Sequence, residues 1–253
     1  MKRVVLKVGS AVLTQDNTLA TQRLSNLVDL IAKLKQQYEV ILVSSGAVAA
    51  GYTLLPLDKS IVGNKQALAS IGQPLLMKEY KENFKKHNVI CSQVLLTADD
   101  FDSRKRTKYA ASALEILLEN GVLPIINEND VTATDELVFG DNDQLAAHVT
   151  HHFNAEMLVI LTDIDGYYDK NPHLYDDAVL QKNINNIDEK MLNIEQVAHS
   201  EFATGGIATK LKAAQFLLEH NNKMYLSSGF DLENVYQFLL KNNHQGGTLF
   251  YKK

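Results

Sequence analysis

The sequence has one cysteine and no long hydrophobic run, and each shortage excludes a class of protein. The single cysteine, Cys91, cannot form a disulfide within the chain or build a structural zinc site, which favours a reducing compartment. No stretch approaches the roughly 18 apolar residues of a membrane span, and the apolar run at the N-terminus ends at Lys7, too early for a signal peptide. Acidic residues outnumber basic ones, 30 to 25, and no basic run suits a nucleic-acid backbone. We therefore expect a cytoplasmic protein that binds neither membranes nor nucleic acid.

Hydrophobic residues make up 45% of the chain and charged residues 22%, as in ordinary globular domains. Runs rich in β-branched residues predict strands, and most of these runs are apolar throughout, which is typical of strands covered on both faces. They lie at residues 4–8, 40–44, 89–96, 123–127, 157–162 and 224–227. Helical spacing of apolar residues marks residues 24–34, 110–117, 145–149 and 207–218. The alternation predicts an α/β fold in one domain, a three-layer α/β/α sandwich around a mostly parallel central sheet.

Polar residues directly follow the predicted strands, at the edge where open α/β sheets bind ligands. The strand ends read Lys7-Val8-Gly9-Ser10, Ser44-Ser45-Gly46-Ala47, Asn127-Glu128-Asn129-Asp130 and Thr162-Asp163. A lysine at a strand end is more often solvated than catalytic, but two glycine turns at neighbouring strand ends are suited to a polyphosphate. Neither the P-loop pattern nor the dinucleotide-binding fingerprint is present, so a nucleotide would be held by another scheme.

Two further segments place polar residues at predicted helix N-termini, where backbone N–H groups favour anions. Residues 140–143 read Gly-Asp-Asn-Asp, and two carboxylates with an asparagine exceed what a helix cap needs. Residues 204–206 read Thr-Gly-Gly and precede a helix that carries Lys210 in its first turn. A capped helix with a solvated lysine explains the second segment equally well. We expect Lys210 to have no role in the core.

Other charged segments have simpler interpretations. His148, His151 and His152 share helical spacing, but no third well-placed ligand accompanies them, so we interpret them as surface or interface histidines. The basic run at residues 104–106 is interpreted as a solvated loop, and residues 164–177 as a long surface loop.

Taken in order, the motifs resemble those of the amino-acid kinase family, and within it the enzymes that phosphorylate the side-chain carboxylate of glutamate. The matching segments are residues 7–10, 44–51, 65–67, 72–73, 93–97, 126–130, 140–143, 161–163, 204–210 and 247–250. The lysines, glycine turns and Thr-Gly-Gly occur across the family, whereas residues 126–130 and 140–143 are more specific to the glutamate branch. Many members carry an additional C-terminal domain, similar to RNA-binding domains, that has no counterpart in this sequence. Tyr109 stands where relatives usually have asparagine.

The resemblance implies a kinase that uses ATP and Mg²⁺ to convert L-glutamate to L-glutamyl 5-phosphate, the first step of proline biosynthesis. Its catalytic residues would be Lys7, Lys210 and Asp143, and its glutamate-binding residues Ser45, Asp130 and Asn142. ATP would be bound by Lys7, Gly9, Ser10, Thr162, Asp163, Thr204, Gly205, Gly206, Ile207, Ala208, Thr209 and Lys210. Mg²⁺ would be carried by the ATP phosphates, without a direct protein ligand. Within the single domain, residues 1 to about 150 would bind glutamate and about 151–253 would bind ATP. Feedback inhibition by proline and assembly into a dimer or tetramer are implied as well.

Two alternatives stay open. The first alternative is a sibling kinase that acts on acetylglutamate, aspartate, carbamate or uridine monophosphate. The second is a non-catalytic nucleotide or amino-acid sensor on the same fold. A phosphate acceptor would call for arginines, and the strand-end motifs contain none. The combination of Lys7, Asp143 and Lys210 argues against a sensor, because a sensor does not need to stabilise the charge of a transition state.

Overall fold

The computed structural model describes residues 1–133, 142–172, 174–192 and 206–253. Within these residues one sheet has the strand order β5-β6-β4-β1-β7-β9-β10-β8. Its strands are β1 (Lys2–Val8), β4 (Tyr38–Ser44), β5 (Cys91–Leu96), β6 (Leu123–Glu128), β7 (Met157–Thr162), β8 (Asn183–Ile184), β9 (Lys223–Ser228) and β10 (Thr248–Phe250). All neighbouring strands are parallel except the pair formed by β9 and β10, which is antiparallel. A small separate hairpin pairs β2 (Thr14–Gln15) with β3 (Thr18–Leu19).

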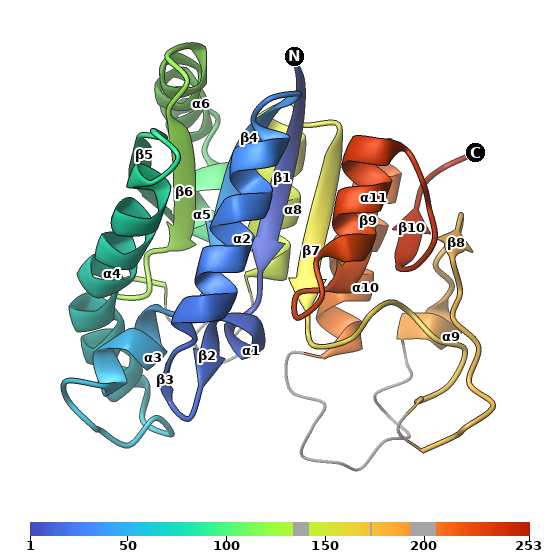
Figure 1. Cartoon of the computed structure of the whole chain (residues 1–253), viewed down its shortest axis with the longest axis horizontal. Helices are drawn as coiled ribbons and strands as arrows, with labels where there is room; N and C mark the ends of the chain where they lie inside the picture. The colour runs from blue at the N-terminus through green and yellow to red at the C-terminus, as the bar shows by residue number, and fades with distance from the viewer. Residues whose placement is uncertain (134–141, 173, 193–205) are drawn as a thin grey trace.

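Helices cover both faces of the sheet, which confirms the predicted three-layer sandwich (Figure 1). One face packs against α2 (Thr21–Leu34), α4 (Val62–Lys85) and α11 (Glu233–Lys241), and the other against α6 (Arg104–Glu119), α8 (Asp143–His152) and α10 (Ile207–Glu219). Shorter helices follow several strands: α1 (Ser10–Leu13), α3 (Ala47–Tyr52), α5 (Ala98–Asp102) and α9 (Glu189–Leu192). No helix in the described part of the chain is long and apolar enough to cross a membrane.

The period-two alternation of β1 decides which way its polar end faces. Val4, Leu6 and Val8 belong to the core under α2 and α4, whereas Val5 belongs to the core under α8 and α10. Successive side chains of a strand point to opposite faces, so Lys7 has the same direction as Val5. The lysine therefore enters the layer that holds α8 and α10.

The predicted strands and helices are all present, but several elements were missed. The largest is α4, whose buried positions include Gly72, Gln73 and Asn83 among the apolar ones, so its hydrophobic stripe is broken. Helix α11 and the short strands β8 and β10 were missed as well. The interpretation of residues 104–106 as a loop was wrong, because they form the first turn of α6, capped by Ser103, with Tyr109 exposed further along. The interpretation of Cys91 as a buried strand residue is confirmed, and burial raises the pKa of its thiol.

Two glycines allow α3 and α4 to cross at close range. A Cβ atom on Gly72 would lie 1.8 Å from the carbonyl oxygen of Ala47, and one on Gly51 would lie 1.9 Å from that of Leu68. Neither space admits a side chain, so the crossing depends on glycine at both positions. The contact fixes where the following residue of α4, Gln73, meets the sheet.

Candidate active site

The parallel register brings the carboxyl ends of the central strands into one row. Val8 of β1 lies opposite Ser44 of β4 on one side and Leu161 of β7 on the other. Val43 of β4 lies opposite Ile126 of β6, so Asn127 follows at the level of Ser44. The residues predicted from the strand ends therefore gather at one edge of the sheet, with β1 at the centre.

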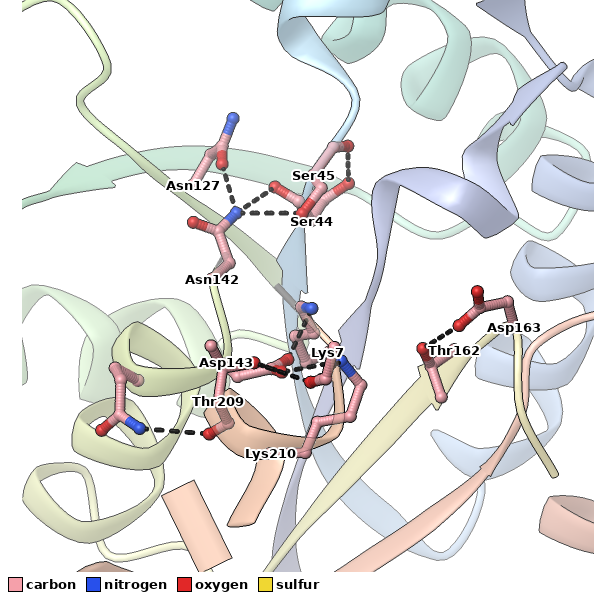
Figure 2. A network of polar contacts seen from close by, with 12 residues as sticks. Lys7, Ser44, Ser45, Asn127, Asn142, Asp143, Thr162, Asp163, Thr209 and Lys210 are labelled. Atoms are coloured by element: carbon pink, nitrogen blue, oxygen red, sulfur yellow. Dashed lines mark hydrogen bonds and ion pairs between the residues drawn. The ribbon is translucent and has the colours of Figure 1, made fainter. Parts of the chain in front are cut away.

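At the centre of that edge, two lysines from distant parts of the chain meet one carboxylate (Figure 2). Lys7 Nζ lies 2.5 Å from Asp143 Oδ1, and Lys210 Nζ lies 3.1 Å from Asp143 Oδ2. Asp143 is the first residue of α8, and Lys210 lies in the first turn of α10. Thr209 Oγ1 is a further neighbour, 3.2 Å from Asp143 Oδ2. The structure thus brings together the three residues that the resemblance implied to be catalytic.

The expectation that Lys210 has no role in the core was wrong. Its side chain is only 6% exposed, and Asp143 is fully buried. Along α10, Lys210 shares one face with the buried residues Ala214 and Leu217, at the spacing i, i+4 and i+7. This spacing was visible in the sequence and indicated burial. A buried ammonium group is tolerated here because the carboxylate of Asp143 pairs with it.

A second polar cluster lies beside the first and involves the predicted glutamate-binding residues Ser45 and Asn142 (Figure 2). Asn142 is the N-cap of α8, and its Nδ2 donates to Ser45 Oγ at 3.3 Å, to Ser44 O at 3.2 Å and to Asn127 Oδ1 at 2.8 Å. Because Asn142 and Asp143 are consecutive, the start of α8 joins this amide cluster to the two lysines. Asp130, the third predicted residue, is half-buried in the turn that follows β6 at the same edge of the sheet.

Thr162 and Asp163, two of the predicted ATP-binding residues, lie on the other side of β1 from Ser45, because β7 and β4 flank β1 on opposite sides. Thr162 ends β7, and its Oγ1 donates to Asp163 Oδ1 at 2.9 Å. Gly9 caps α1 and donates its backbone N–H to Leu161 O at 3.0 Å, which places the exposed Ser10 beside this strand end. Gly206 is the N-cap of α10, and Ile207, Ala208 and Thr209 form the first turn with Lys210. Thr204, Gly205, Gly140 and Asp141 lie outside the described residues.

The three histidines of α8 form part of an aromatic cluster away from this edge. His148 and His152 each stack on Phe101 of α5, with ring centroids 5.3 Å apart, and His151 lies 4.1 Å from His220 at the end of α10. Burial, followed by the neighbouring His152, lowers the pKa of His148. Within the described ranges, no group of three or more His, Cys, Asp or Glu residues is placed to hold a metal ion.

Comparison with known proteins identifies the class to which this fold and site belong. The sequence profile of the Amino acid kinase family matches residues 2–227, and the chain belongs to this family. A glutamate 5-kinase of Leishmania donovani is 55% identical over 253 residues, which cover 100% of this chain and 96% of that protein. A glutamate 5-kinase of Wolinella succinogenes is 53% identical and covers 99% of this chain and 98% of its own. The resemblance inferred from the motifs is therefore confirmed.

A solved structure shows the same fold at low sequence identity. The carbamate kinase from Giardia lamblia bound to AMP-PNP superimposes with a TM-score of 0.68 at 16% identity, and the match covers 100% of this chain and 99% of that one. At this identity the likeness establishes the fold alone.

Asn127 and Gln73 received no individual role from the sequence, although Asn127 belongs to the polar strand end at residues 127–130 and Gln73 to the matching segment at residues 72–73. Both side chains are buried, and Asn127 contacts Asn142 directly. For Asn127 the signal was available, because an amide directly after an apolar strand has to find polar partners inside the protein. For Gln73 the motif at residues 72–73 was visible, but helical periodicity gave no indication of its position, since its helix was not predicted.

Proposed function

We propose that this protein transfers the γ-phosphoryl group of ATP to the γ-carboxylate of L-glutamate, the opening step of proline biosynthesis. A carboxylate oxygen of glutamate attacks the γ-phosphorus, and the bond from that phosphorus to the β–γ bridging oxygen breaks. The products are L-glutamyl 5-phosphate and ADP. Identities of 55% and 53% to glutamate 5-kinases, over nearly the full length of each, support this acceptor.

The observation that carries the proposal is the convergence of Lys7 and Lys210 on Asp143. Phosphoryl transfer needs little covalent participation from the protein, because the transition state is stabilised by positioning and by positive charge around the moving group. Two ammonium groups held by one carboxylate provide that charge in a fixed arrangement. The acceptor carboxylate is ionised at neutral pH and needs no general base.

The amide cluster supplies the amino-acid side of the site. The Ser45 hydroxyl and the Asn142 amide can hydrogen-bond the charged ends of glutamate, and the Asp130 carboxylate suits its ammonium group. Because Asn142 precedes Asp143, an amino acid held here lies beside the two lysines. Residues 1 to about 150 thus bind glutamate, and the ATP-binding residues from Thr162 onward belong to the second part of the same domain, with Lys7 shared between them.

The residues present fit a Mg²⁺ ion that arrives on the nucleotide. In kinases Mg²⁺ keeps several waters and is bound mainly through substrate phosphates with one or two carboxylates, and no larger acidic cluster is needed. Both oxygens of Asp143 face lysines, so this carboxylate is engaged by the protein's own cations. When bound, the ion neutralises phosphate oxygens, while the protein supplies the lysines that orient them.

The decisive experiment is an acyl-phosphate trap. Purified protein is incubated with ATP, Mg²⁺ and hydroxylamine, and each of glutamate, acetylglutamate, aspartate, carbamate and uridine monophosphate is added in turn. Glutamate should produce ADP and a hydroxamate in equal amounts, since hydroxylamine displaces phosphate from an acyl phosphate. ADP release that does not depend on glutamate, or that depends on another acceptor, would contradict the proposal.

The division of the site is tested by two matched variants. Asp130→Ala should raise the KM for glutamate about tenfold or more, because a hydrogen bond to a charged group contributes about 1.5–3 kcal/mol, and should leave the KM for ATP nearly unchanged. Thr162→Val should have the opposite preference, because its hydroxyl lies on the β7 side. If either variant changes the KM for glutamate and the KM for ATP equally, that residue does not belong to the part of the site assigned to it.

Three further expectations stay predictions, the first two implied by the resemblance. Proline is expected to inhibit, which adding proline to the trapping assay at low glutamate would measure. A dimer or tetramer is expected, and sedimentation equilibrium would determine its size. A cytoplasmic location is expected from the single cysteine.

A further inference from the structure

A chain of side-chain amides extends from the proposed glutamate site into the core between the sheet and α4. Asn142 Nδ2 donates to Asn127 Oδ1 at 2.8 Å, and Asn127 Nδ2 donates to Gln73 Oε1 at 2.8 Å. Gln73 Nε2 continues toward Gln93 Oε1 of β5 at 3.4 Å. We infer that Gln73 is a positioning residue for the amino-acid substrate, acting through Asn127 on Asn142; this inference rests on the proposed function.

Two backbone groups fix the orientation of the Asn142 and Asn127 amides. The carbonyl of Ser44 can only accept, so the atom of Asn142 that lies 3.2 Å from it must be Nδ2. The backbone N–H of Glu128 can only donate, so the atom of Asn127 that lies 2.9 Å from it must be Oδ1. Asn127 consequently presents Nδ2 to Gln73, and only an acceptor at that position completes the set.

Gln73 reaches this point because of the crossing of α3 and α4 at Gly51 and Gly72. The close approach places the next residue of α4 against the end of β6, where its side chain is 8% exposed. Asn127 is 3% exposed, so water cannot replace the oxygen of Gln73 as the partner of its Nδ2. Without that oxygen, Asn127 Nδ2 is a buried donor with no acceptor on this side, which favours rotation of the amide toward another acceptor.

Rotation of Asn127 would disturb the substrate site at a distance. Its Oδ1 accepts the shortest hydrogen bond of Asn142, and that bond directs Asn142 Nδ2 into the protein. With Nδ2 so directed, Oδ1 is the atom of Asn142 that can accept a hydrogen bond from the ammonium group of glutamate. The hydrogen bonds that link Gln73 to Asn127 and Asn127 to Asn142 do not involve Lys7 or Lys210, which contact Asp143. The loss of this hydrogen-bond relay should therefore affect glutamate binding and leave ATP binding intact.

The test uses two substitutions of Gln73 and one control on the same helix. Gln73→Met keeps the side-chain length and removes the acceptor, and Gln73→Glu keeps an acceptor oxygen. Asn83→Leu is the control, because Asn83 is also a buried amide of α4, equally exposed at 8%, but bonds Glu79 O and Lys86. All are assayed by hydroxamate formation with each substrate varied, and folding is checked by thermal melting.

Gln73→Met should raise the KM for glutamate about tenfold, equivalent to about 1.4 kcal/mol, and change the KM for ATP less than twofold. Gln73→Glu should restore most of the affinity for glutamate. Asn83→Leu should lower the melting temperature and leave both KM values unchanged. In an Asn142→Ala background, Gln73→Met should have no further effect on the KM for glutamate, since the relay then has no end point.

Several results would overturn the inference. If Gln73→Met raises both KM values equally, or acts additively with Asn142→Ala, Gln73 is a structural residue only. If Gln73→Met does not fold, Gln73→Glu decides: a folded Glu variant whose KM for glutamate is as poor as that of Asn142→Ala contradicts the relay. Wild-type protein that shows no glutamate-dependent hydroxamate would instead refute the proposed function, which separates the two failures.

Discussion

Replacing Asp143 by asparagine is the sharpest test of the buried charge cluster. The carboxylate is fully buried and pairs with two ammonium groups whose side chains are 3% and 6% exposed. Asparagine has nearly the same shape but carries no charge, so both lysines lose their counter-ion. Removing one partner of a buried ion pair costs about 3–5 kcal/mol, because the remaining charge is left uncompensated. For a chain of this size, that cost corresponds to a fall of about 6–20 °C in melting temperature.

The same substitution should also reduce kcat about 10²–10³-fold, the effect typical of losing one element of transition-state charge stabilisation. Lys210→Met is the matched control, because it removes one ion pair and leaves Asp143 bonded to Lys7. It should reduce kcat to a similar extent but lower the melting temperature less than Asp143→Asn does. Melting is followed by circular dichroism and activity by hydroxamate formation. An Asp143→Asn protein that melts within 2 °C of wild type, or a Lys210→Met protein that melts lower than Asp143→Asn, would refute the reasoning.

Two further predictions concern packing and pH. Gly72→Ala should lower the free energy of unfolding by about 3 kcal/mol or more, since its Cβ would overlap the Ala47 carbonyl. Gly63 lies in the same helix with open space around it, so Gly63→Ala should raise the free energy of unfolding by about 0.5–1 kcal/mol. Chemical denaturation that ranks the two variants in the opposite order would contradict the close helix crossing. Because burial lowers the pKa of folded His148, the unfolded chain binds the proton first as pH falls through about 6.5, so stability is full above that pH and declines below it. The fall in melting temperature between pH 8 and pH 6 should be smaller in His148→Gln, and an equal fall in both proteins would exclude this histidine as its source.

Much of the fold follows from local patterns that the sequence displays directly. Continuous apolar runs such as residues 157–162 alternate with helical spacing, and parallel strands covered on both faces are the arrangement that buries both. The same patterns place the polar strand ends at one edge of the sheet, which is why Lys7, Ser45 and Thr162 were found. Helix α4 escaped because glycine and amide residues interrupt its buried face.

Long-range contacts were decided by the tertiary structure alone. The sequence contains Lys7, Asp143 and Lys210 as separate motifs, but only the packing of α8 and α10 on β1 turns them into one buried cluster with opposite charges in contact. The proposed role of Gln73 depends even more on the tertiary structure. It requires two glycines that let α4 approach α3, and an asparagine at the end of β6. Periodicity reports which face of an element is buried, whereas the partner of a buried polar group is set by elements far away along the chain.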